Sequence, residues 1–251
     1  MEYISALDLL EEELPEIEHI NCGTKMDAIT NGFCVGEVHI ISGNPKNGKS
    51  LALLHSAILC AISGKKVCYL SLENAKEEDH RRVMDAITTY NFAEEDLYNL
   101  NNLNFMFLQG QDKILENYVK PSTQEDFDII YIDGSEYLNP PGDSGADINK
   151  KGRIIIRELR KYSSESPRKA PIIISWQNNK LAIDKSIKDV TPADLGGSYG
   201  LAQVAVSIWM IIKDLKKKTW QMRLLCSRER YDEKMDTINV RDENGNFNLL
   251  Y

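Results

Sequence analysis

Compact runs of apolar residues alternate with amphipathic segments along most of the chain. Five of these runs are short and apolar throughout, which is typical of strands buried on both faces of a sheet. The predicted strands are residues 38–42, 67–72, 105–108, 128–133 and 171–176. Helical periodicity or helix-forming composition lies between them, at residues 51–63, 76–90, 112–120 and 153–162. We therefore predict an α/β fold with a mainly parallel central sheet flanked by helices.

The pattern changes toward both ends of the chain. Residues 178–200 are polar and glycine-rich without clear periodicity, which predicts a long loop. Residues 204–212 and 220–227 are apolar again, and they predict an antiparallel β-hairpin around the basic tip Lys216-Lys217-Lys218. Near the N-terminus, residues 4–13 have one apolar face among acidic residues, as a short amphipathic helix does.

We expect one domain, residues 19–251, preceded by an amphipathic arm, residues 1–18. Pro15 should end the helix of the arm, and Pro121 the helix at 112–120, because proline lacks the amide hydrogen that a helix interior needs. A helix as short as that of the arm is not stable alone in water. It therefore needs a surface to dock on, either its own domain or a neighbouring subunit.

Composition narrows the class of protein. A chain of 251 residues suits one large domain. Its net charge of −8 excludes a wholly basic protein that coats nucleic acid, although it leaves room for a local basic channel. No apolar run is long enough to span a membrane, and the acidic N-terminus does not resemble a signal peptide. The five cysteines are scattered without a CxxC pair, so we expect reduced thiols in a cytoplasmic protein.

The strongest chemical signal follows the strand at 38–42. The segment fits the pattern G-x-x-x-x-G-K-[ST] of a phosphate-binding loop, and a predicted helix follows it. The expected nucleotide-binding residues are Gly43, Asn44, Pro45, Lys46, Asn47, Gly48, Lys49, Ser50 and Leu51. Backbone amides of such a loop and the N-terminus of the helix attract phosphate. Lys49 would reach the β- and γ-phosphates of ATP, and the Ser50 hydroxyl would bind Mg²⁺.

Three other polar residues end predicted strands, where ligands of parallel sheets bind. Asp133 ends the strand at 128–133 and is expected beside the loop, in the Mg²⁺ shell. Glu73 follows the strand at 67–72. If that strand neighbours the phosphate-loop strand, Glu73 would face the γ-phosphate and deprotonate the attacking water. Glu136 is the rival candidate for this base. Gln177 follows the strand at 171–176 and is placed to sense the γ-phosphate.

Two arginines follow the last predicted strand. Arg228 and Arg230 are two residues apart, so they project from the same face of an extended segment. They lie far along the chain from the phosphate loop. In a ring ATPase, an arginine of one subunit can stabilise charge in the site of the next, and this pair is a candidate for that role.

Taken in order, these segments resemble the RecA-like ATPase domain of DnaB-type replicative helicases, especially bacteriophage versions. The segments that carry the resemblance are Gly43–Ser50, Ser71–Glu73, Ile130–Asp133, Ser175–Asn179, Asp194–Val206 and Ser227–Arg230. The resemblance spans roughly residues 20–235. It implies that Glu73 is the catalytic glutamate and that Gln177 couples nucleotide to DNA-binding loops. It also implies that Arg230, or Arg228 beside it, is the arginine finger acting on a neighbouring subunit.

The resemblance further implies a hexameric ring with single-stranded DNA in its central pore. The pore loops would be residues 139–151 and 180–198, whose lysines could contact DNA phosphates without reading sequence. These lysines are Lys150, Lys151, Lys180, Lys185 and Lys188. The chain departs from the family pattern in showing no N-terminal domain for primase contact or ring assembly. We therefore expect a primase or helicase-loader partner to supply that role.

Three functions remain open at this point. The first is an ATP-driven, ring-forming motor that translocates on single-stranded DNA as a replicative helicase. The second is a RecA- or KaiC-like ATPase that acts as a recombinase, loader or regulator without unwinding. The third is a binding protein that uses nucleotide only as a switch. Oligomeric form on DNA distinguishes the first two, and multiple turnover that depends on Glu73 would exclude the third.

Overall fold

The computed structural model describes residues 16–107, 115–140, 148–179, 185–195, 199–214, 219–228, 236–241 and 246–250. Several predictions lie outside these residues, and the structure says nothing of them. They are residues 1–15 of the arm, residue 108 of a predicted strand, residues 112–114 of a predicted helix, residues 141–147 of the first pore loop, residues 180–184 (with Lys180) and 196–198 of the second, the Lys216–Lys218 tip and Arg230. Among the residues described, no helix is both long and apolar enough to cross a membrane.

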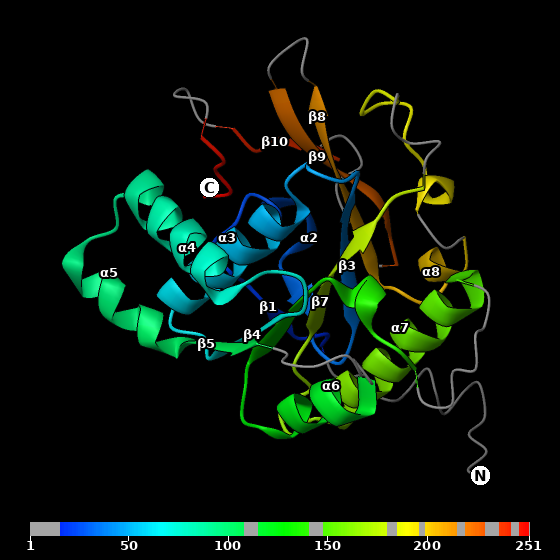
Figure 1. The fold of residues 1–251 in the computed structure, drawn as a ribbon, viewed down its shortest axis with the longest axis horizontal. Coiled ribbons are helices and arrows are strands. Elements are labelled where there is room, and N and C mark those ends of the chain that lie inside the picture. Colours follow the sequence, from blue (N-terminus) through cyan, green and yellow to red (C-terminus); the bar gives the residue numbers. More distant parts are fainter. Residues whose placement is uncertain are drawn as a thin grey trace.

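An eight-stranded sheet forms the centre of the molecule, in the order β10-β9-β8-β3-β7-β6-β4-β5 (Figure 1). The strands are β3 (Val38–Gly43), β4 (Val67–Ser71), β5 (Leu103–Phe107), β6 (Ile129–Asp133), β7 (Ile172–Gln177), β8 (Ser207–Asp214), β9 (Thr219–Ser227) and β10 (Thr237–Asn239). The six strands from β8 to β5 are parallel, whereas β9 and β10 are antiparallel to their neighbours. The predicted α/β fold with a closing antiparallel hairpin is confirmed.

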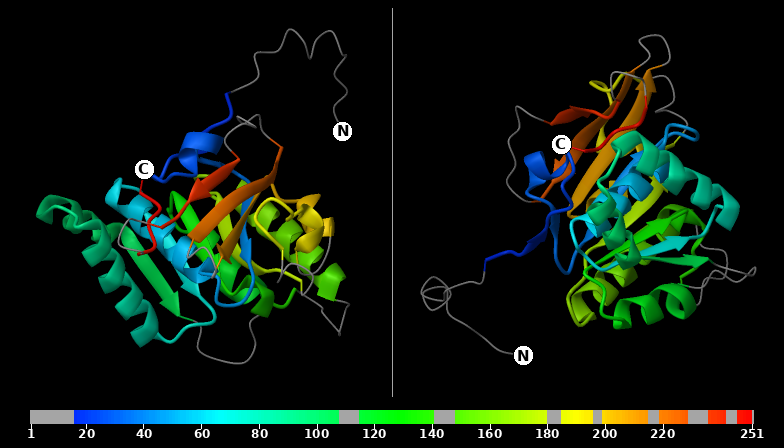
Figure 2. Two further views of the ribbon diagram at one scale, coloured as in Figure 1. Left: turned by 90° about the horizontal axis from the view of Figure 1, so that it is seen from above. Right: turned by 90° about the vertical axis from the view of Figure 1, so that its left-hand side faces the viewer.

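Helices cover both faces of this sheet (Figures 1 and 2). The helices are α2 (Asp27–Thr30), α3 (Lys49–Ile62), α4 (Lys76–Tyr90), α5 (Glu94–Tyr98), α6 (Leu115–Gln124), α7 (Ile148–Glu165) and α8 (Tyr199–Ala202). Successive strand residues point to opposite faces, so the strands contribute to two apolar cores. One core contains Ile41, Tyr69 and α3, and the other contains Ile40, Leu70 and α7. Being covered on both faces explains why the strands are apolar throughout.

Smaller elements complete the structure. The described residues include the 3₁₀ turns η1 (Asn99–Asn102), η2 (Ser135–Tyr137) and η4 (Pro192–Asp194). A two-stranded sheet pairs β1 (His19–Ile20) with β2 (Phe33–Cys34). The sequence patterns did not predict β1, β2, α5 or β10, which are only two to five residues long. Such short elements are too brief to show a periodicity of their own.

One expectation about the helices was wrong. Pro121 does not close a helix but lies inside α6. The helix continues past it for one turn, where the hydroxyls of Ser122 and Thr123 donate to the carbonyls of Val119 and Lys120. Side-chain hydroxyls thus pair with backbone carbonyls in the last turn of the helix, close to its end.

The sequence left open whether the strand that leads to Glu73 neighbours the phosphate-loop strand, and in the structure it does not. The neighbours of β3 are β7 and β8, and both β7 and β6 separate it from β4. β7 also lies between β3 and β6, the strand that ends in Asp133. This strand order decides how the candidate site is assembled.

Candidate active site

The phosphate loop connects β3 to α3, as its sequence pattern predicts. β3 ends at Gly43, and α3 begins at Lys49. Within the loop, the Asn47 amide donates to the carbonyl of Asn44 over 3.1 Å. Gly48 has a φ of +91°, a left-handed conformation that favours glycine. The loop thus turns directly into the N-terminus of a long buried helix, the arrangement that binds phosphate in many folds.

Gln177 lies beside the first residue of this loop. It ends β7, its register partner in β3 is Gly43, and its side chain is exposed. The next backbone amide, that of Asn178, donates to the carbonyl of Gly43 over 3.1 Å. β7 therefore brings a polar side chain to the phosphate loop from between β3 and β6. Asn178 itself is buried, and sequence reasoning assigned it no role.

Asp133 and Glu73 lie close together, although neither β6, which ends in Asp133, nor β4, which leads to Glu73, pairs with β3. In the β4–β6 pair, Asp133 is the register partner of Ser71, and its carbonyl accepts a hydrogen bond from the Leu72 amide over 3.0 Å. The Cβ of Glu73 is 3.2 Å from the point where a side chain at Gly134 would begin. The carboxyl ends of parallel strands share one edge of the sheet, so both acids still reach the same site.

Glu136 connects these acids to the phosphate loop. It lies in the turn η2 after β6, half-buried, and burial is the main cause that raises the pKa of its carboxyl. The charge of Lys49 acts in the opposite direction, whereas Glu73 and Asp133 raise the pKa of Glu136 further. These electrostatic effects require proximity. Lys49, Glu73, Asp133 and Glu136 therefore form one cluster of charged groups at this edge.

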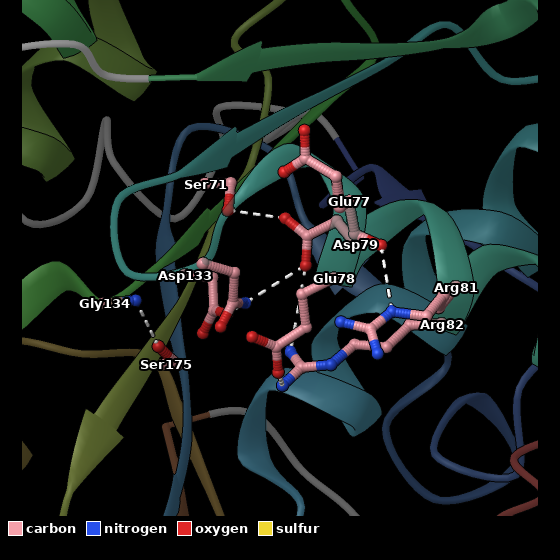
Figure 3. A network of polar contacts seen from close by, with 10 residues as sticks. Ser71, Glu77, Glu78, Asp79, Arg81, Arg82, Asp133, Gly134 and Ser175 are labelled. Atoms are coloured by element: carbon pink, nitrogen blue, oxygen red, sulfur yellow. Dashed lines mark hydrogen bonds and ion pairs between the residues drawn. The ribbon is translucent and has the colours of Figure 1, made fainter.

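A polar network behind Asp133 was not predicted from the sequence (Figure 3). Asn74 donates from Nδ2 to both Asp133 Oδ2 and Asp79 Oδ1, each over 3.1 Å. Asp79, on α4, also accepts a 2.6 Å hydrogen bond from the Ser71 hydroxyl and lies 3.8 Å from Arg82. Burial raises the pKa of Asp79. In the sequence, α4 carries many charged residues, and nothing distinguishes the buried aspartate from its exposed neighbours.

The residues at this edge suit an Mg²⁺–nucleotide complex. Asp133 is fully buried, and no hydrogen-bond partner for its Oδ1 lies within the described part of the chain. Ser50 lies in the first turn of α3, next to Lys49. No cluster of three or more histidine, cysteine or acidic residues that could hold a metal alone occurs in the described ranges. Mg²⁺ commonly uses one or two protein oxygens together with phosphate oxygens and water, which these residues fit.

Arg228 lies at the other end of the sheet. It directly follows β9, level with His39 at the start of β3, and its guanidinium donates to the carbonyl of Gln203. His39 and Gly43 are four strand residues apart, roughly 13 Å. The structure therefore does not bring Arg228 together with the phosphate loop of its own chain. Its candidate companion, Arg230, lies outside the described residues.

The candidate DNA-binding lysines have different surroundings. Lys150 and Lys188 are exposed, which leaves their charges accessible. Lys151 donates to the Asn139 side chain over 2.7 Å. Lys185 forms an ion pair of 2.7 Å with the buried carboxylate of Asp194, so part of its charge is already compensated.

Two solved structures resemble the chain over nearly its whole length. The first, solved as an ATPase domain, has a TM-score of 0.71 and 20% sequence identity, covering 98% of this chain and 96% of that one. The second is a DnaB-like replicative helicase, solved in a study of its interactions with primase. It has a TM-score of 0.71 and 22% identity, covering 98% of this chain and 66% of that one. Neither family models nor curated proteins match the sequence. The chain therefore has the RecA-like fold of DnaB-like ATPase domains.

Proposed function

We propose that this protein is an ATPase motor of the helicase type, which hydrolyses ATP and moves along single-stranded DNA. One observation carries the proposal: the phosphate loop, Asp133, Glu73 and Gln177 meet at the carboxyl edge of a RecA-like sheet. The order β3-β7-β6-β4 interposes the strand of Gln177 between the loop and the acids. A nucleotide on the loop would thus have the polar ends of three further strands beside it.

Each residue of this edge has a distinct role in the proposal. Lys49 binds the β- and γ-phosphates of the substrate ATP, and the loop amides hold the rest of the phosphate chain. Ser50 and Asp133 would hold Mg²⁺, which neutralises charge on the transferred phosphoryl group when it is bound. Glu73, whose side chain is exposed at this edge, takes the proton of the attacking water. Gln177 contacts the γ-phosphate and passes its presence to the loop after β7.

Assembly into a ring completes the proposed site. Arg228 is at the far end of the sheet from its own loop, so it can assist only a site on another copy of the chain. Head-to-tail contacts of this kind close into rings when the rotation between copies permits. We propose a hexamer in which Arg230, with Arg228, reaches the nucleotide of the neighbour. Lys150 and Lys188 then face DNA in the pore, and a primase- or loader-type protein is the proposed partner.

The test measures ATP turnover with and without single-stranded DNA, and unwinding of a forked duplex. Lys49→Ala should abolish turnover, whereas Lys65→Ala, at the other end of α3, should not. Glu73→Gln should lower turnover at least ~100-fold with little change in ATP binding. The matched control is Glu77→Gln, an exposed glutamate at the start of α4.

Different outcomes separate the candidate functions. DNA-stimulated turnover with unwinding supports the motor. Turnover with filaments on DNA and no unwinding favours a recombinase-like or loading ATPase. Nucleotide binding without multiple turnover would contradict both and leave a nucleotide-dependent switch.

A further inference from the structure

The side chain of Asn74, in the turn after β4, connects the end of β6 to helix α4. Its Nδ2 donates one hydrogen bond to Asp133 Oδ2 and another to Asp79 Oδ1, each over 3.1 Å. An amide nitrogen has two hydrogens, so both are used. Ionised carboxylates only accept, and a flipped amide would place its oxygen against two acceptors. The orientation of the Asn74 amide is therefore determined by the two acids on either side of it.

Asp79 is itself held from several directions, so it is a fixed anchor for Asn74. Its carboxylate is buried, with 1% of the residue exposed, and its Oδ2 accepts the 2.6 Å hydrogen bond from Ser71. Arg82, one turn further along α4, lies 3.8 Å from Oδ1 and also pairs with Glu78. Figure 3 shows these groups arranged between α4 and the ends of the two strands.

The consequence for Asp133 is that its two oxygens become different. Oδ2 is occupied by Asn74, whereas Oδ1 is buried and has no hydrogen-bond partner among the described residues. Oδ1 is therefore the oxygen left to face a metal ion or its bound water, and the buried phenol of Tyr69 is a further polar group close to this carboxylate. Asn74 also directly follows Glu73 in the chain, so fixing its side chain restrains the backbone that carries the proposed base.

We propose that Asn74 is a positioning residue that presents Asp133 Oδ1 to Mg²⁺ and holds Glu73 in register with it, with Asp79 as its anchor. This inference rests on the proposed ATPase function. Outer-shell partners of metal ligands typically contribute 10- to 100-fold to metal affinity or activity. We therefore expect Asn74→Ala to weaken metal binding at the nucleotide site about 10-fold.

The first experiment measures metal binding without turnover. Mn²⁺ is titrated into the protein with ADP, and the free ion is followed by electron paramagnetic resonance. Asn74→Ala should raise the Mn²⁺ dissociation constant about 10-fold, while ADP affinity in EDTA stays unchanged. Ser71→Ala, which removes one support of Asp79, should give a smaller shift in the same direction. This milder variant keeps the test decisive if Asn74→Ala folds poorly.

The matched control is Asn104→Ala, on β5. Asn104 also donates two hydrogen bonds from its Nδ2, but to the backbone carbonyls of Val67 and Asn102. It should leave metal affinity unchanged. Equal Mn²⁺ affinity in wild type, Asn74→Ala and Ser71→Ala would overturn the inference, as would an equal loss in Asn104→Ala.

The same variants are then compared in ATP turnover at varied Mg²⁺. The half-saturating Mg²⁺ concentration should rise about 10-fold in Asn74→Ala, in parallel with the Mn²⁺ result. Absence of turnover in the wild type would contradict the proposed function. Normal turnover with an unshifted Mg²⁺ requirement in Asn74→Ala would contradict the positioning role alone.

Discussion

Gly134 offers a test of whether the geometry around Glu73 matters for turnover. It has a φ of +81°, and a Cβ added there would lie 3.0 Å from Tyr137 Cδ2 and 3.2 Å from Glu73 Cβ. Gly64, at the end of α3, has a similar φ of +87°, but nothing lies within 4 Å of an added Cβ. Alanine at either position is strained in the left-handed conformation, which should lower the free energy of unfolding by about 1–2 kcal/mol in both variants. Only Gly134→Ala also pushes against the proposed base.

The size of the effect on turnover follows from the contact distance. Ordinary Cβ contacts begin near 3.4 Å, so Glu73 must move by a few tenths of an ångström. A 1 Å misplacement in a site can cost about 100-fold, so a shift of this size corresponds to roughly 10-fold in kcat. The assay combines urea unfolding with kcat measured where both variants are fully folded. Both should lose stability, Gly134→Ala more because of its added close contacts, and only Gly134→Ala should lose turnover. Unchanged kcat in Gly134→Ala, or an equal loss in Gly64→Ala, would refute the reasoning.

Three further predictions concern groups in different parts of the molecule. Burial lowers the pKa of His55 to about 3, so the unfolded chain binds a proton there between about pH 6.5 and 3 and the folded chain does not. The free energy of unfolding, measured with urea, should therefore fall between pH 7 and pH 5, and it should fall by about 2 kcal/mol more in the wild type than in His55→Gln. Parallel pH profiles of the two proteins would contradict this. Glu136→Gln should retain turnover within ~10-fold, and a loss as large as in Glu73→Gln would instead make Glu136 the base. Arg223 donates hydrogen bonds to the carbonyls of residues 187 and 188 and pairs with Asp236 over 2.7 Å. Arg223→Ala should therefore lower the free energy of unfolding by about 1–3 kcal/mol and speed proteolysis near residue 188. A cleavage pattern identical to that of the wild type would count against this.

The apolar runs of the sequence were sufficient to predict every strand of the eight-stranded sheet except β10. Strands such as β6 and β7 are buried on both faces, so their composition is apolar and can be recognised in the sequence. The phosphate loop could also be predicted from the sequence, because its backbone geometry depends on residue types at fixed spacing. The order of the strands could not be predicted from the sequence. The connection between two strands of a parallel sheet can pass over a third strand that lies between them without any change in the two strands that it joins. The sequence therefore left open whether β4 lies next to β3, and Glu73 reaches the site from two strands further away.

Side-chain networks were the other part that the sequence did not predict. Asp79 lies on a helix with several other acids, and it alone is buried, where it accepts hydrogen bonds from Ser71 at the end of β4 and from Asn74. Asn74 follows Glu73 directly and could be read as an ordinary residue before a helix. Only the pairing of Ser71 with Asp133 brings the end of β6 close enough for the amide of Asn74 to connect it to α4.

The position of β3 in the sheet has a consequence for biosynthesis. The residues that pair with Gly43 are Gln177 and Ile211, so β3 finds its first sheet neighbour 134 residues later in the chain. At about 5–20 residues per second, the ribosome needs roughly 7 to 27 seconds to make that stretch. Throughout this interval the apolar strand and the helix α3 have no completed sheet to cover. Nascent chains that end before β7 should therefore bind chaperones or aggregate, and chains that include β8 should become protease-resistant.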